Sequence, residues 1–151
     1  MSRTGREDML ILKGSLCDIE AAISDFVQEK ARQSGLGNKR TWELLLALDE
    51  ICSSLVFHNG CVREDHEVRL SWQEDSDSIT VCLFENGVPF NPFVSVEEEA
   101  GAEEETRQLG GMSHELLGRM VDEMSYEHRD GWNCLTIRKY LQHHRRRSSA
   151  V

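Results

Sequence analysis

Apolar and polar residues follow two periodicities along this chain, and these predict an alternation of strands and helices. A short apolar run at residues 9–14 predicts a strand. Apolar positions three and four apart then predict a helix that begins at Asp18, whose carboxylate can accept from the first backbone N–H groups. Gly35 and Gly37 are expected to end this helix, because glycine readily adopts the left-handed conformation that closes one.

A second helix is predicted after Asn38, which can serve as its cap, and Asn59-Gly60 is expected to stop it. It is apolar around much of its circumference, which indicates that it is buried against a sheet. Two strands at residues 67–72 and 79–84 follow, and the polar turn between them predicts a hairpin.

The periodic pattern is lost after residue 84. Both prolines, Pro89 and Pro92, occur here, and six glutamates fall within residues 97–105. Clustered like charges repel one another and bury nothing, so a mobile lid is predicted at residues 94–109.

Regular structure is predicted again after Gly110-Gly111, which precedes a short third helix. A strand at residues 124–128 and a final strand at 132–141 flank Asp130-Gly131, a strong hairpin turn. This order of elements predicts an α/β (α+β) two-layer sandwich, with a mostly antiparallel sheet covered on one face by helices.

The domain organisation expected from this pattern is simple. Residues 1–8 are predicted as a disordered N-terminus and residues 143–151 as a disordered basic tail. Residues 9–142 form one domain, and 151 residues with 39% hydrophobic composition suit a single two-layer core.

Composition excludes several function classes. The formal net charge of −10 argues against a nucleic-acid partner, because binding phosphates requires clustered Lys and Arg. No stretch reaches the roughly 18 apolar residues that a membrane span requires. Five cysteines without metal-ligand spacing are expected to be free thiols, which favours a cytoplasmic location.

Three segments could carry chemistry. Glu50, Ser54 and His58 are spaced to share one face of the second helix, although a solvated stripe would have the same spacing. Glu85 and Gly87 directly follow a strand, which suits a ligand loop or a plain turn. Gly110-Gly111 at a helix start suits a phosphate or a flexible hinge.

Taken in this order, the segments resemble the Bergerat-fold (GHKL) ATPases, and most closely the anti-sigma-factor serine kinases. The resemblance extends from about Leu10 to Leu141. It is most specific at residues 121–139, and it is also clear in the loop Glu85-Asn86-Gly87-Val88-Pro89-Phe90-Asn91-Pro92 and in Asp49-Glu50-Ile51-Cys52.

The resemblance implies an ATP site with Mg²⁺. Glu50 matches the glutamate that acts as general base. Ser54 stands where the family has a Mg²⁺-binding asparagine, Glu85 where an aspartate accepts from adenine, and Ser113 where a glycine is usual. The remaining nucleotide contacts that it implies are His58, Gly87, Pro89, Gly110 and Gly111.

The implied function is an anti-sigma-type regulator that binds ATP and phosphorylates a serine on a small anti-anti-sigma (STAS-type) partner. Because three nucleotide contacts depart from the family pattern, an alternative is a binding module of the same fold that sequesters a sigma factor or anti-anti-sigma partner without turnover. An α/β domain with no nucleotide role is the third possibility. By analogy with the family, a homodimer formed through the sheet edge is expected.

Overall fold

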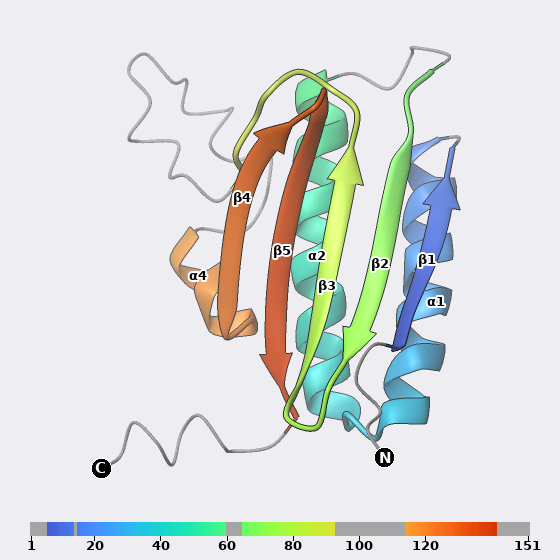
Figure 1. Ribbon diagram of the computed structural model, residues 1–151, viewed down its shortest axis with the longest axis vertical. Coiled ribbons are helices and arrows are strands. Elements are labelled where there is room, and N and C mark those ends of the chain that lie inside the picture. Colours follow the sequence, from blue (N-terminus) through green and yellow to red (C-terminus); the bar gives the residue numbers. More distant parts are fainter. Residues whose placement is uncertain (1–5, 14, 60–64, 93–113, 142–151) are drawn as a thin grey trace.

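The computed structural model describes residues 6–13, 15–59, 65–92 and 114–141, and within them it contains five strands and three helices. Figure 1 shows the strands as one sheet with the helices on one of its faces. In chain order the elements are β1 (Arg6–Leu12), α1 (Leu16–Ser34), α2 (Asn38–Asn59), β2 (Val68–Glu74), β3 (Ser78–Glu85), α4 (His114–Met120), β4 (Glu123–Arg129) and β5 (Trp132–Tyr140).

The sheet has the strand order β1-β2-β3-β5-β4, and every neighbouring pair is antiparallel. A hairpin joins β2 to β3, and another joins β4 to β5. The second hairpin turns at Asp130 and Gly131, whose φ values of 55° and 85° are the paired positive angles of a tight two-residue turn. The predicted antiparallel two-layer fold is confirmed.

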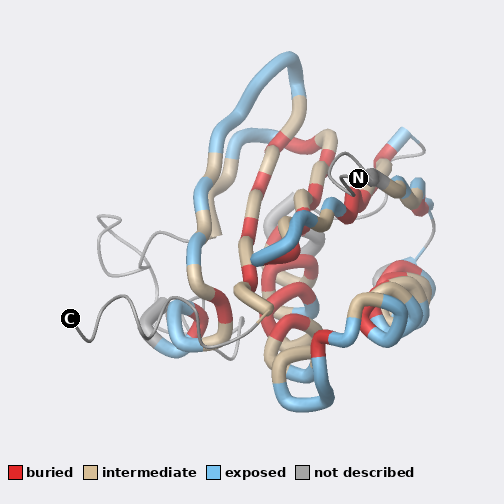
Figure 2. The backbone as a smooth tube through the Cα atoms, turned by 60° about the horizontal axis from the view of Figure 1, so that its bottom comes forward, coloured by how far each residue is buried: buried red, intermediate tan, exposed pale blue. Residues whose placement is uncertain are grey.

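Burial alternates along the neighbouring interior strands β3 and β5, as expected for a sheet with one covered face. The buried positions face the helices, and Figure 2 shows them opposite the buried side of α2. The core joins strand residues to one side of each long helix; its largest fully buried members include Trp72, Ile19, Leu44, Leu48, Ile51, Leu55, Leu70, Ile79, Leu83, Leu135 and Ile137.

The ends of α1 are set by two local contacts. The Ser15 hydroxyl accepts a hydrogen bond from the Asp18 backbone N–H at 3.1 Å, so Ser15 is the cap and the helix begins at Leu16. The predicted start at Asp18 is therefore wrong, because the hydroxyl three residues earlier takes the capping role. Gly35 ends the helix with a φ of 76°, as predicted.

The N-terminal strand differs from the prediction as well. β1 begins at Arg6, so residues 6–8, assigned above to a disordered N-terminus, pair with β2 instead. Lys30 of α1 also forms an ion pair with Asp8 of β1. The predicted lid at 94–109 and the tail at 143–151 lie outside the described residues. No helix in the described ranges is long and apolar enough to cross a membrane.

Truncation of the α2 core should destabilise the fold. Leu48 is only 1% exposed. We expect Leu48→Ala to lower the free energy of unfolding by about 2–5 kcal/mol, because the lost side chain leaves a cavity. Urea denaturation measures this, with Leu116→Ala as a control that should change stability by only about 0.5 kcal/mol, since Leu116 is exposed. Equal effects would contradict the assigned core.

Candidate nucleotide site

One side of α2 carries a line of polar residues that faces β5 and α4. Glu43 begins this line and accepts a hydrogen bond from Lys139 of β5, with Nζ 2.6 Å from Oε1. Lys139 also donates to the carbonyl oxygen of Met120 at the end of α4, which ties three elements together. Glu50 and Ser54 follow Glu43 at spacings of about two and three helical turns, so they lie on the same side of α2.

Glu50 has the electrostatic properties of a proton acceptor near neutral pH. Its carboxylate is half-buried on α2. Burial, and secondarily the charge of Asp49, raise its pKa from 4.5 to about 7. A carboxylate whose pKa lies near the working pH is suited to general base catalysis.

Ser54 is half-buried and lies one turn beyond Glu50 on α2. The two residues therefore share one side of the helix, as their spacing predicts. His58 belongs to the last turn of α2, but its side chain lies outside what the structure describes. Gly110, Gly111 and Ser113 also lie outside the described residues. Their predicted place beside the phosphates therefore stays a prediction.

Glu85 ends β3 on the face that carries the helices, and its side chain is completely buried. One carboxylate oxygen lies 2.7 Å from Nε2 of His66, and the other accepts a hydrogen bond of 2.9 Å from the Asn133 amide. Asn133 is the cross-strand neighbour of Glu85 in β5. A buried carboxylate needs such partners, and here both of its oxygens are engaged by the protein itself.

Asn133 extends this network into the loop that follows β3. Its amide donates to the Val88 carbonyl at 2.8 Å, while its side-chain oxygen accepts from the Phe90 N–H at 3.0 Å and the Tyr126 hydroxyl at 2.6 Å. Among the described residues no buried side-chain nitrogen or oxygen lacks a hydrogen-bond partner. The loop is therefore held across the start of β5 in a defined conformation.

The rest of the loop after β3 is also well fixed. Gly87 is buried and Pro89 is exposed. The Asn86 side chain accepts from the Glu67 N–H at 2.8 Å and donates to the Asp65 carbonyl, which connects the loop to the start of β2. In Figure 1 the end of β3 lies at the same end of the sheet as the C-terminal end of α2. The structure thus brings Glu85 and Gly87 to the end of α2 that carries Ser54.

Sequence reasoning missed His66, Tyr126 and Asn133. Asn133 had a recognisable signal, because it occupies a helix-facing position in a strand whose other helix-facing residues include Leu135 and Ile137. His66 had no such signal, since it precedes β2 and reaches Glu85 only through the tertiary fold.

The residues on this side of α2 also bear on the expected Mg²⁺. Within the described residues no three His, Cys, Asp or Glu side chains are grouped as metal ligands. Magnesium bound with a nucleotide needs only one or two protein oxygens, because phosphates and water supply the others. The hydroxyl of Ser54 is an oxygen donor of the right kind for such a role.

Comparison with known families agrees with this architecture. The family model described as the histidine kinase-like ATPase domain matches residues 15–139, which is most of the chain. The chain therefore belongs to this family, and ATP is the nucleotide that the family implies.

The chain is also similar to a protein kinase. The serine/threonine-protein kinase BtrW of Bordetella bronchiseptica is 24% identical over 94 residues. The match covers 62% of this chain and 66% of the relative, so it spans slightly less than two thirds of the length of BtrW.

Loss of Asn133 should weaken the whole end of the sheet. In Asn133→Ala, Glu85 and the loop after β3 lose their shared partner, and we expect a loss of about 2–4 kcal/mol in the free energy of unfolding, because buried polar groups are left unpaired. Tyr126→Phe removes the hydrogen bond that the hydroxyl donates to Asn133 and the one of 3.2 Å that it accepts from the Phe90 N–H. It should cost about 1–2 kcal/mol, because Asn133 still binds Glu85 and the loop. Chemical denaturation compares the two. An Asn133→Ala loss no larger than that of Tyr126→Phe would contradict this network.

The raised pKa of Glu50 should make stability depend on pH. Between pH 4.5 and about 7 the folded chain holds this proton more tightly than the unfolded chain does, so the contribution of Glu50 to stability falls as pH rises through that window. Glu50→Gln removes the titration. We therefore expect the variant to gain stability relative to the wild type when urea unfolding is measured at about pH 8 rather than about pH 5. A difference independent of pH would show that Glu50 titrates normally.

Proposed function

We propose that this protein binds ATP with Mg²⁺ and phosphorylates a serine on a small anti-anti-sigma (STAS-type) protein, and so regulates transcription by partner switching. The observation that carries the proposal is Glu50, a half-buried carboxylate on α2 whose pKa burial raises to about 7. Membership of the histidine kinase-like ATPase family supports it, as does the similarity to a serine/threonine-protein kinase.

In the proposed reaction the Glu50 carboxylate accepts the proton of the partner's serine hydroxyl. The serine oxygen then bonds to the γ-phosphorus of ATP while the bond from that phosphorus to the β-phosphate oxygen breaks, so that ADP leaves. Magnesium would neutralise charge on the phosphates, with the Ser54 hydroxyl as its protein ligand. Gly110 and Gly111 are assigned to the phosphates, and Gly87, Pro89 and His58 to the rest of the nucleotide.

The partners follow from the same proposal. A sigma factor would be held when the anti-anti-sigma protein is phosphorylated, and released when it is not. We expect a cytoplasmic homodimer, as in the family that the sequence resembles. The net charge of −10 disfavours direct binding to nucleic acid.

A second candidate is a binding module of the same fold that sequesters a sigma factor or an anti-anti-sigma protein without phosphorylating it. Glu85 favours this alternative, because its side chain is 0% exposed and both of its oxygens are engaged by His66 and Asn133. An adenine amino group can donate a hydrogen bond to Glu85 only through a carboxylate lone pair that His66 and Asn133 do not already occupy.

Incubation with γ-labelled ATP, Mg²⁺ and a candidate STAS-type protein tests the kinase. We expect label on a partner serine and a loss of about 10²–10⁴-fold in the phosphorylation rate for Glu50→Gln, because the base is removed. Glu29→Gln is the matched control, since Glu29 is exposed on α1 and should leave the rate unchanged. The rate should also rise with pH through about 7, as Glu50 ionises.

Nucleotide binding is measured separately by thermal shift, so that loss of binding is not mistaken for loss of catalysis. Glu50→Gln should keep the stabilisation by ATP, which amounts to about 2.7 kcal/mol at 100 times the Kd. If the partner binds stably but no phosphate label is transferred and ATP causes no thermal shift, the protein is the binding module rather than the kinase.

A further inference from the structure

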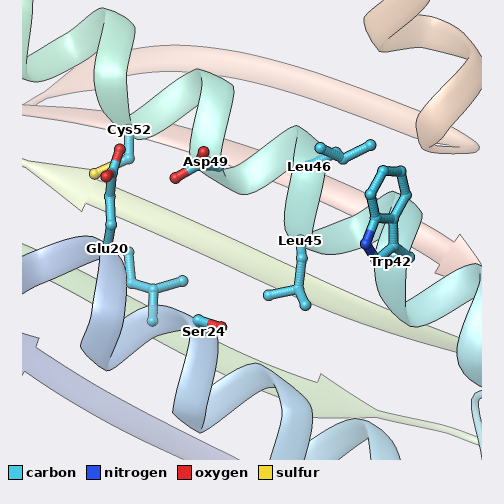
Figure 3. Close-up of a pocket in the computed structure, with 8 residues that line it drawn as sticks. Glu20, Ser24, Trp42, Leu45, Leu46, Asp49 and Cys52 are labelled. Carbon is cyan, nitrogen blue, oxygen red and sulfur yellow. The ribbon is translucent and has the colours of Figure 1, made fainter. Parts of the chain in front are cut away.

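A cavity of about 240 Å³ lies between α1 and α2, on the side of α2 away from Glu50. Its lining includes Glu20 and Ser24 of α1 and Trp42, Leu45, Asp49 and Cys52 of α2. Figure 3 shows Glu20 extending towards Cys52 at one end and the Trp42 ring at the other. Small-molecule sites usually measure about 300–1,000 Å³, so this hollow is better suited to side chains than to a nucleotide.

One part of the cavity is acidic. The Glu20 carboxylate accepts a hydrogen bond of 2.8 Å from the Ser53 hydroxyl, and Asp49 lies one turn before Ser53 on α2. Neither carboxylate forms an ion pair with a cation in the described part of the chain. Burial raises the pKa of Glu20 above its ordinary value; the Ser53 hydrogen bond opposes this rise, whereas a hydrogen bond to Asp49 and the charge of Asp49 add to it. A positive group placed here would compensate two neighbouring carboxylates.

The other part of the cavity is apolar. Trp42 is 63% exposed, the most exposed of the large hydrophobic side chains in the described residues. Leu45 and Leu46 continue this surface along α2. Trp42 and Asp49 are two helical turns apart, about 10 Å along the axis, which leaves room for two adjacent side chains of a partner.

We propose that this cavity is a docking site for a protein segment in which an arginine is next to an aliphatic residue. The guanidinium group pairs with Glu20 and Asp49, because its planar fork matches carboxylates. The aliphatic side chain packs on Trp42 and Leu45. Tryptophan and arginine are among the residue types that most often dominate the binding energy of protein interfaces.

Other occupants fit less well. The glutamate-rich residues 97–105 carry the same charge as the cavity, which disfavours them. The basic residues 143–147 of the same chain have the complementary charge and are therefore tested directly below. The site does not depend on the proposed kinase activity, because Glu50 and Ser54 lie on a different side of α2, and its test uses no nucleotide.

The full-length chain with ¹⁵N-labelled tryptophan is titrated with acetyl-Leu-Arg-Leu-amide and followed by NMR. The indole signal of Trp42 should shift saturably, while that of the buried Trp72 should not move. The peptide with citrulline in place of arginine should bind at least about tenfold more weakly, since it lacks the charge. A saturable shift of equal affinity with both peptides would overturn the proposal.

Variants locate the binding site. Glu20→Gln/Asp49→Asn should weaken the arginine peptide at least about tenfold, as expected for a charge-assisted pair. Glu29→Gln, an exposed change on the same helix α1, should leave the affinity unchanged.

If the double variant fails to fold, Trp42→Ala takes its place, and the affinity for the peptide is then measured from the Leu45 methyl signals. Unchanged affinity for the arginine peptide in these variants would overturn the proposal. Much tighter peptide binding by the triple variant Arg145→Gln/Arg146→Gln/Arg147→Gln would also overturn it, because the chain's own tail would then be the occupant of the cavity.

Discussion

The packing of α2 against the centre of the sheet is the constraint on which the rest of this molecule depends. Leu44, Leu48, Ile51 and Leu55 are almost completely buried, and α2 lies behind β3 and β5 in Figure 1. Once these positions face the sheet, helical geometry determines where all others point. Glu50 then faces the side of α4, and Asp49, its neighbour in sequence, faces α1. One buried stripe thus separates the proposed nucleotide side of the helix from the docking cavity.

At the upper end of the sheet in Figure 1, buried polar groups replace apolar ones. The buried carboxylate of Glu85 is paired with His66 and Asn133. These bonds satisfy the carboxylate without any ligand, and a satisfied buried network also stiffens its surroundings. This end of the fold can therefore be stable in the absence of nucleotide, which is compatible with a kinase and with a pure binding module.

Much of the fold could be predicted from the sequence, because its signals are local. The spacing of apolar residues in α2, the glycine that ends α1 and the Asp130-Gly131 turn each act within a few residues. The start of α1 could not be placed from the sequence, since Ser15 and Asp18 are both good caps. The site was predictable only in part: Glu50 and Ser54 share a side by simple periodicity, whereas the partners of Glu85 come from distant segments and required the tertiary structure.

The polar residues of β5 have a consequence for strand pairing itself. Asn133 and Lys139 lie at the two ends of its helix-facing row, with Leu135 and Ile137 between them. A slip of β5 by one residue against β3 would turn this entire row to the opposite face and separate both polar side chains from their partners. A slip by two would keep the face but bring Leu135 opposite Glu85. The two polar residues therefore act as register marks, and they select one pairing among several that hydrophobicity alone would allow.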